Sequence, residues 1–385
     1  MNATENMNKS PRVKRESKNR IRVDFERAPL KERLKARFLN LNFLLKVVIY
    51  IFRLVFLIGI SYVVLYPFIT KIAGSFMAPQ DFVDVTVRLI PKNFTLDIYR
   101  AIFTELGYWN AFINTMFLAG ANAIIQVIVC CMIGYGFAKF KFKGRNIIFI
   151  LVMITMIIPH QTMQLSLFMN FRYFDLYGLF PLLGGNGITV GTNEATGEAI
   201  KILTSINLAP HHLSEAGAIV YDGIWTNTGL NLCNTYWPLI LLSVTGLGFK
   251  NGLYIFLLRQ FYRSIPDELE ESAYLDGSTP FHTFLTVILP LSIPMMITVF
   301  LFSFSWQWTD EFYTGLFFTS SRTKLITSIV SIPESLKMDY AGQQLYYTAI
   351  RNTIGICIIM PLVILYTFLQ NFIVEGIEHS GLTAD

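Results

Sequence analysis

The stretch SIPDELEESAYLDGSTPFHTFLTVILPLSIP, residues 264–294, joins a short acidic segment to a long apolar one. Ser264 can cap a helix, and Pro266 suits a first helical turn. Gly277 is a residue that readily adopts the left-handed conformation at a helix end. The stretch therefore predicts a short acidic helix that ends at Gly277 and cannot cross a membrane. Acidic residues favour the positive end of the helix dipole, and four lie in its first half: Asp267, Glu268, Glu270 and Glu271.

Long apolar runs flank this segment on both sides. The chain has 385 residues, of which 53% are hydrophobic and only 15% charged, as expected of a polytopic membrane protein. Because lipid cannot satisfy backbone amides, apolar runs of about 20 residues are expected to be helices. Six such spans are predicted, at residues 54–70, 109–138, 146–164, 235–258, 281–308 and 352–374.

Basic residues set the expected orientation. Of the 31 Lys and Arg residues, 13 lie between Lys9 and Lys46, before the first span. The positive-inside rule then predicts a cytoplasmic N-terminus, with the basic loop 139–145 (KFKFKGR) and the loop 259–276 on the same side of the membrane. With six spans the C-terminus is also expected in the cytoplasm.

The predicted organisation has three parts. A basic cytoplasmic tail at 1–46 precedes a transmembrane domain at 47–376, and a cytoplasmic tail at 377–385 follows it. Within the domain we expect an extended external loop at about 178–229 and the acidic loop at about 263–285.

Several kinds of chemistry find no support in the sequence. Three of the four cysteines lie in predicted spans, so neither a disulfide framework nor a metal site is expected. No Gly-x-x-x-x-Gly-Lys-Ser/Thr loop is present to hold a nucleotide, and no Gly-x-Ser-x-Gly or His-Glu-x-x-His motif suggests a hydrolase. We therefore expect no enzyme, no cofactor and no nucleic-acid partner.

The acidic loop resembles the cytoplasmic loop of permease subunits from binding-protein-dependent ABC importers. That family shows Glu-Ala-Ala, three residues, Gly, nine residues, and Ile-x-Leu-Pro. Here Glu271, Ser272 and Ala273 are followed by Gly277 and, at the same spacing, by VILP at 287–290. Ser replaces the first Ala and Val replaces Ile.

Further stretches look like the carbohydrate branch of this family, especially its maltose-type second permease subunit. The resemblance covers the chain from about residue 50 to the C-terminus. The stretches are FLLRQFYRSIP at 256–266, AKFKFKGRN at 138–146, NTYWPLIL at 234–241, the cluster Trp306, Gln307 and Trp308, and QNFIVEGI at 370–377.

The resemblance implies an all-α fold of the type I ABC importer permease, with about six transmembrane helices and a short cytoplasmic coupling helix. It also implies a second permease subunit that completes a heterodimer, ATP-binding ABC subunits, an extracellular solute-binding protein, a lipid bilayer and a sugar or oligosaccharide substrate. Carried over residue by residue, the contact with the ATPase falls on Glu270, Glu271, Ser272, Ala273, Asp276 and Gly277.

Pro290 and Pro294, four residues apart in the fifth span, are hinge candidates. Each proline removes a helical hydrogen bond and favours a bend. Such a bend would transmit movement of the acidic loop to the pore, as alternating access requires. The alternative is a bend that only shapes a static helix.

The fourth span contains TGLGFKNG at 245–252, which places glycines and Lys250 inside an apolar run. Broken, polar helices near the middle of a membrane often mark substrate sites, so Lys250 is a candidate for the substrate pathway, unless the span starts later and leaves it at a surface. Trp306 and Trp308 are further candidates because aromatic faces suit sugar rings. Aromatic residues at that depth also form interfacial belts.

The main alternative function is a secondary transporter powered by an ion gradient. Such a transporter usually needs carboxylates within its spans, and none of the six predicted spans contains Asp or Glu. The external loop suits either contact with the solute-binding protein or a tolerated surface insertion.

Overall fold

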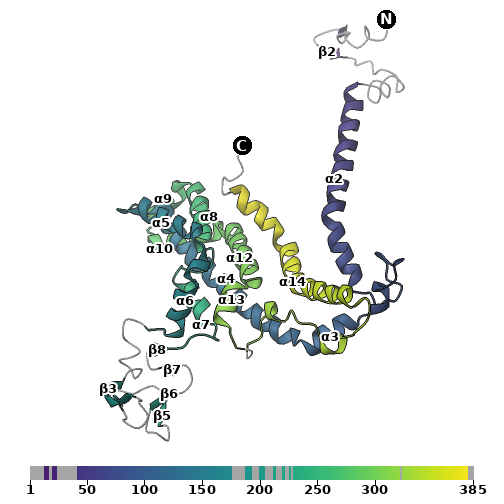
Figure 1. The fold of residues 1–385 in the computed structure, drawn as a ribbon. Coiled ribbons are helices and arrows are strands. Elements are labelled where there is room, and N and C mark those ends of the chain that lie inside the picture. The colour runs from purple at the N-terminus through teal and green to yellow at the C-terminus, as the bar shows by residue number, and fades with distance from the viewer. Residues whose placement is uncertain are drawn as a thin grey trace. The chain divides into compact units, whose positions relative to one another are not determined.

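The structure is a computed structural model. It describes residues 13–16, 20–23, 41–175, 187–192, 199–203, 211–213, 219–221, 225–226, 229–320 and 323–379, and the rest of the predicted tails and external loop lie outside this description. The chain divides into two compact units, Met1–Lys71 and Ile72–Asp385 (Figure 1). The first unit holds an antiparallel hairpin of β1 (Val13–Glu16) and β2 (Arg20–Val23), followed by most of α2 (Leu41–Gly74).

The second unit is built mainly of helices. Long apolar helices alternate with short connecting helices, which are of α, 3-10 or π type. In chain order they are η2 (Pro79–Phe82), α3 (Asp97–Glu105), α4 (Tyr108–Lys139), α5 (Arg145–Ile157), η3 (His160–Met163), α6 (Gln164–Arg172), α7 (Trp237–Val244), α8 (Asn251–Ser264), α9 (Asp267–Leu275), α10 (Pro280–Thr283), η5 (Phe284–Ile288), α11 (Leu289–Leu291), α12 (Ile293–Trp308), α13 (Phe312–Phe317), η6 (Ile326–Ser328), η7 (Glu334–Leu336) and α14 (Gln343–His379).

In the described part of this unit, the strands lie between α6 and α7, within or at the end of the predicted external loop. There they form three antiparallel hairpins of two strands each. The pairs are β3 (Gly187–Thr192) with β4 (Ala199–Leu203), β5 (His211–Leu213) with β6 (Ile219–Tyr221), and β7 (Trp225–Thr226) with β8 (Gly229–Leu230).

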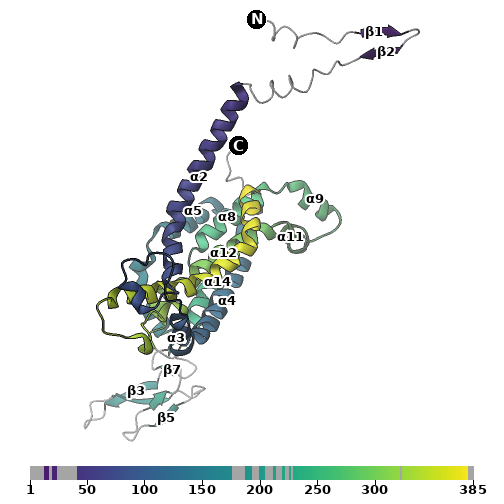
Figure 2. The same cartoon turned by 90° about the vertical axis from the view of Figure 1, so that its right-hand side faces the viewer.

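Helix α4 lies at the centre of the second unit. It packs against α7, α8 and α12, and α12 also packs against α14 (Figure 2, where α4, α8, α12 and α14 are labelled). Buried aromatic and aliphatic side chains fill these contacts, with Trp308 and Tyr254 among the largest that are fully buried. The shared core places α4 between the fourth and fifth predicted spans. Movement of one of these spans would therefore be transmitted to the other through α4.

The apolar spans of the structure agree with only part of the predicted set of six. By length and composition, three helices in the described part of the chain can cross a membrane: Leu45–Gly74, Tyr108–Lys139 and Gln343–Val374. The number rises to five if two bent helix pairs are each one span. The fourth predicted span is divided into α7 and α8, so the count of six is not confirmed.

The fifth predicted span bends by 76° between Leu291 and Ile293. Pro290 and Pro294 lie on the two sides of this bend, and a π-helical turn, η5, precedes it. Pro294 has no N–H to donate to the carbonyl of Pro290, so the helical ladder is interrupted there. The bend is thus located where the prolines predicted it, while its movement stays a prediction.

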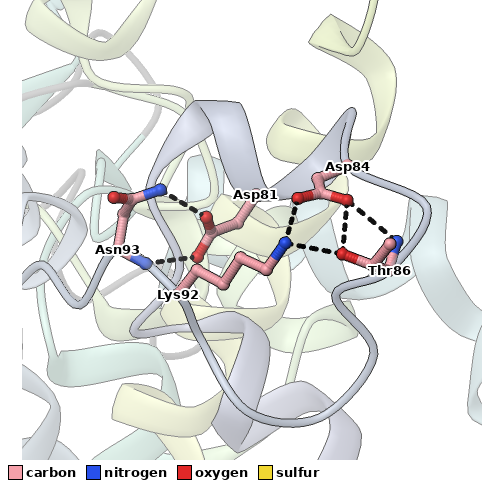
Figure 3. A network of polar contacts seen from close by, with 5 residues as sticks. All are labelled: Asp81, Asp84, Thr86, Lys92 and Asn93. Atoms are coloured by element: carbon pink, nitrogen blue, oxygen red, sulfur yellow. Dashed lines mark hydrogen bonds and ion pairs between the residues drawn. The ribbon is translucent and has the colours of Figure 1, made fainter.

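The loop that joins α2 to α3 is held by polar contacts which the sequence analysis did not anticipate (Figure 3). Lys92 Nζ donates to Asp84 and to Thr86 Oγ1, in both cases over 2.6 Å. The Asp81 carboxylate accepts from the backbone N–H of Asn93 over 3.0 Å and from its side-chain amide over 2.7 Å. These bonds close a compact loop and fix the entry to α3.

Candidate functional site

The predicted acidic helix exists as α9, between the fourth and fifth predicted spans. It begins at Asp267, directly after Pro266, as the proline and the acidic residues indicated. Gly277 has a φ of +83°, a left-handed conformation that Gly adopts at little cost, and its N–H donates to Tyr274 O over 3.0 Å. The helix stop was therefore predicted correctly.

Ser264 does not cap α9, contrary to the prediction. It is the last residue of α8, and its hydroxyl donates back to the carbonyl of Phe261 over 2.7 Å. The residue at the N-cap position of α9 is Pro266, which supplies no side-chain hydrogen bond. Sequence spacing alone did not separate the end of one helix from the start of the next.

One lysine fastens α9 to the end of α4. Lys139 Nζ lies 2.6 Å from Asp267 Oδ1 and 3.6 Å from Glu270 Oε1, and it donates to the carbonyl of Ile265 over 2.9 Å. The side chains of Lys139 and Glu270 are only 8% and 9% exposed, so this pair is shielded from water, whereas Asp267 is 78% exposed and meets Lys139 at the surface. A buried charge that is paired in this way makes the base of α9 a fixed point.

The two carboxyl groups at this base have different environments. Hydrogen bonding to Lys139 holds the pKa of Asp267 below its ordinary value. Burial raises the pKa of Glu270, although Lys139 acts in the opposite direction. Glu270 is thus turned toward the protein and away from the solvent.

The predicted coupling residues do not share one environment. Glu270 is buried, Ala273 is half-buried, and the remaining four are exposed: Glu271, Ser272, Asp276 and Gly277. The exposed residues form an acidic surface, with the small Ala273 at its edge, that is available to a docking partner. On the opposite side of the helix, the buried Glu270 pairs with Lys139 of α4.

The break in the fourth predicted span brings two of the three predicted pathway residues together. Lys250 Nζ lies 4.9 Å from the ring centroid of Trp306 and 5.0 Å from that of Phe249, within the range of cation–π attraction. Lys250 has a φ of +64°, which is uncommon for a residue with a side chain. Such a conformation persists only where the surrounding structure enforces it.

Two aromatic rings contact this lysine and further rings pack against them, and sequence reasoning missed three of the group: His160, Phe249 and Phe312. The imidazole of His160 lies 4.9 Å from the ring centroid of Phe249 and 4.7 Å from that of Phe312. Phe249 lies 5.6 Å from Trp306 in turn. We call this group, His160, Phe249, Lys250, Trp306 and Phe312, the aromatic cluster.

Trp308 lies apart from the aromatic cluster. It is fully buried, and its indole N–H donates to the carbonyl of Ile358 in α14 over 2.9 Å. Trp306, two residues earlier on α12, is 46% exposed. The structure therefore brings Lys250 and Trp306 together and gives Trp308 a contact within the core.

A buried polar network lies next to the break between α7 and α8. Gln126 donates to Ser243 Oγ over 3.3 Å and accepts from Ser303, which joins α4 to α7 and α12. A Cβ on Gly248 would lie 2.5 Å from Gln126 Nε2, so any larger residue would displace the Gln126 amide from this network. The sequence shows Gln126 as an amide inside an apolar run, but its partners, Ser243 and Ser303, are more than 100 residues away in the chain.

Comparison with known proteins gives the family. A family model described as "Binding-protein-dependent transport system inner membrane component" matches residues 126–379. The alpha-glucoside transport system permease protein AglG of Rhizobium meliloti is 26% identical over 287 residues, covering 74% of this chain and 60% of that protein. The arabinooligosaccharides transport system permease protein AraQ of Halalkalibacterium halodurans is 24% identical, covering 84% and 92%.

A solved structure agrees with this result. A bacterial ABC transporter involved in the import of the acidic polysaccharide alginate contains a chain with a TM-score of 0.54 and 17% identity, covering 84% of this chain and 96% of that one. At this identity the likeness shows the fold alone. The resemblance predicted from the acidic loop is confirmed, and the comparisons give the ion-gradient alternative no support. Because the family model covers well over half of the chain, this protein belongs to the inner-membrane components of binding-protein-dependent transport systems.

Proposed function

We propose that this chain forms half of the translocation pathway of an ABC importer for a carbohydrate, which an extracellular solute-binding protein delivers. The other half is a second permease subunit, and the energy comes from separate ATP-binding subunits. The observation that carries the proposal is α9, an acidic helix between two predicted spans with Glu271, Ser272, Asp276 and Gly277 exposed and its base fastened to α4.

The fastening supports a role in coupling. A helix that is pushed by a partner transmits the movement only if its other side is fixed to the moving element. Lys139 provides that link to α4, which lies at the centre of the unit. We propose that Glu271 and Asp276 contact the ATPase, that Ala273 permits close approach, and that Gly277 provides the turn.

Two observations support a sugar as the solute. The relatives named above are an alpha-glucoside and an arabinooligosaccharide permease, and the aromatic cluster offers an exposed ring beside a cation. Aromatic faces stack on the C–H faces of sugars, and an ammonium donates to hydroxyl or carboxylate oxygens. We propose that Lys250 and Trp306 line the pathway.

The bilayer arrangement follows from the same proposal. Both termini and α9 lie in the cytoplasm of a bacterial cell, and the strands between α6 and α7 lie outside. The external position of those strands makes them available to the solute-binding protein.

The test is purification of the chain from mild detergent with its permease and ATPase partners co-expressed. Wild type is compared with Gly277→Pro, Glu271→Lys and a charge control on an exposed residue outside α9, Glu311→Lys. We expect the first two variants to lose ATPase retention or solute-stimulated hydrolysis while remaining folded, and the control to keep both. If the chain purifies alone and vesicles containing it take up solute without ATP, the proposed function is wrong.

A further inference from the structure

A basic cavity lies at the base of α9, apart from the surface proposed to meet the ATPase. Its volume is about 450 Å³, and its walls come from the end of α4, the start of α5 and the end of α8. Its charged lining consists of Lys139, Lys141, Arg145, Arg259, Arg263 and Asp267. Five cations thus share one cavity with a single carboxylate.

That carboxylate is already engaged, so the cavity keeps an excess of positive charge. Asp267 pairs with Lys139 at 2.6 Å. In the described part of the chain, no carboxylate forms an ion pair with Lys141, Arg145, Arg259 or Arg263. Like charges held together without a counter-charge are unfavourable, and an anion in the cavity would relieve this repulsion.

Arg259 is fixed in place with a donor unused. Its guanidinium carbon lies 4.0 Å from the ring centroid of Phe149, which orients the guanidinium plane. Its Nε is shielded from solvent and has no hydrogen-bond partner among the described residues. A buried donor without a partner is costly, because nothing replaces the water that it lost.

The first turn of α5 adds donors to the same cavity. This helix of 13 residues begins at Arg145, and Gly144 before it supplies no side-chain cap. Asn146, in that first turn, lines the cavity. Backbone amides left free at the start of a helix favour an anion such as phosphate.

We propose that this cavity is a binding site for a phosphate group, with Arg259 and Arg263 as its principal donors. Guanidinium groups match the planar geometry of two phosphate oxygens and remain charged at all working pH values. A neutral solute, or a carboxylate of the chain itself, would complement the cations and the helix start of this cavity less well than a phosphate group.

The phosphate has two possible sources, a phospholipid headgroup and free phosphate. Next to the cavity, α5 presents the exposed apolar side chains Ile147, Ile150 and Leu151, along which an acyl chain can lie. Basic cavities between membrane helices at the cytoplasmic side commonly bind anionic headgroups. This arrangement favours the lipid as the source.

The test measures ligand retention on the full-length chain by native mass spectrometry, with phosphatidylglycerol, phosphatidylcholine and inorganic phosphate as separate probes. The variants are Arg263→Gln and the double variant Arg259→Gln/Arg263→Gln. Lys143→Gln is the matched control, because Lys143 is an exposed cation in the same basic loop that does not line the cavity.

We expect phosphatidylglycerol to bind wild type and its affinity to fall about tenfold or more in the double variant, less in Arg263→Gln, and under about twofold in the control. Binding of inorganic phosphate alone with the same variant order supports the site and identifies free phosphate as the source. Equal loss in the Lys143→Gln control, or no dependence on Arg259 and Arg263, overturns the proposal. The single variant Arg263→Gln keeps the Arg259 to Phe149 contact, and a melting temperature equal to that of wild type separates lost binding from misfolding.

Discussion

Three features position Lys250, and two of them involve other helices, α4 and α12. The Lys250 backbone is left-handed, Gly248 lets the preceding turn approach Gln126, and Trp306 of α12 lies under its ammonium group. Each feature would be lost if the break in the fourth predicted span became regular helix. A strained conformation supported from several sides is typical of functional positions.

The first prediction concerns the charge of Lys250. In the assembled transporter we expect Lys250→Gln to raise the KM for the transported solute by up to about tenfold, because a desolvated cation–π contact is worth about 1 to 2 kcal/mol and its cation is also removed from the solute. Basal ATP hydrolysis should be unchanged. Uptake into proteoliposomes measures the KM, and phosphate release without solute measures basal hydrolysis. Lys337→Gln, which changes an exposed lysine paired with Glu334, is the control. An unaltered KM would remove Lys250 from the pathway.

The second prediction concerns the fastening of α9. Lys139→Met leaves the buried Glu270 carboxylate without its cation, which should weaken the docking of α9 by about 1 to 3 kcal/mol. Hydrogen exchange of the α9 amides should become faster, whereas Lys143→Met should leave it unchanged. Adding Glu270→Gln to Lys139→Met should restore much of the protection, since the unpaired charge is then gone.

The same pair predicts a pH dependence with a defined sign. Burial raises the pKa of Glu270, so the docked carboxyl binds its proton more tightly than a free one does. Docking in Lys139→Met should therefore be strongest below the ordinary pKa of 4.5 and weaken as the pH rises through the raised value. A trend in the opposite direction would show that Glu270 is not buried in the docked state.

At the scale of elements, the bent fifth span connects α9 to the core. The segment from α10 to α11 follows α9 directly, and α12 packs against α4 and α14. The 76° bend therefore stands between the proposed coupling helix and the bundle. Movement of α9 can reach the pathway through this bend and through Lys139.

The third prediction tests whether the prolines maintain the bend. In Pro290→Ala/Pro294→Ala the missing N–H donors return, so we expect the span to straighten and solute-stimulated ATP hydrolysis to fall. Spin labels are placed at the exposed positions Phe281 and Thr309, at the two ends of the span. Pulsed electron paramagnetic resonance should give a longer distance between them in the double variant than in wild type. Pro361→Ala in α14 is the control. An unchanged distance would show that packing alone maintains the bend.

Local signals predicted some elements correctly and others only in part. Pro266, the acidic turn and Gly277 act within a few residues, and α9 has the expected start and stop. The third predicted span was read as continuous to residue 164, yet it turns by 91° between Ile157 and His160. An apolar run predicts that a segment is in lipid, but not whether it is straight.

At the scale of the whole molecule, contacts between distant segments were beyond sequence reasoning. The aromatic cluster joins His160, Phe249 and Phe312, and the polar network joins Gln126 to Ser303. No periodicity or spacing relates such positions, because their distances are set by how the helices pack. The basic cavity beside α9 belongs to the same class, since α5 and α8 both contribute to it.

If the two bent pairs are each one span, a sixth membrane crossing requires that α7 and α8 together form one span. They have 8 and 14 residues, so end to end they would measure about 33 Å at 1.5 Å per residue. The hydrocarbon layer is about 30 Å thick, so the pair is long enough to cross while either helix alone is not. At their junction the Thr245 hydroxyl donates to the carbonyls of Leu241 and Leu242, which satisfies backbone acceptors at the end of α7, as a broken span requires.

The last prediction follows from this length. A cysteine at Ser278, after α9, and one at Thr226, in β7, should lie on opposite sides of the membrane if α7 and α8 cross it. In intact cells a membrane-impermeant maleimide should label Thr226→Cys. It should label Ser278→Cys only after the cells are permeabilised. The four native cysteines are buried, which keeps background labelling low. Labelling of both variants from outside would mean that the pair does not cross. The α9 surface would then be unable to meet a cytoplasmic ATPase, whatever its sequence resembles.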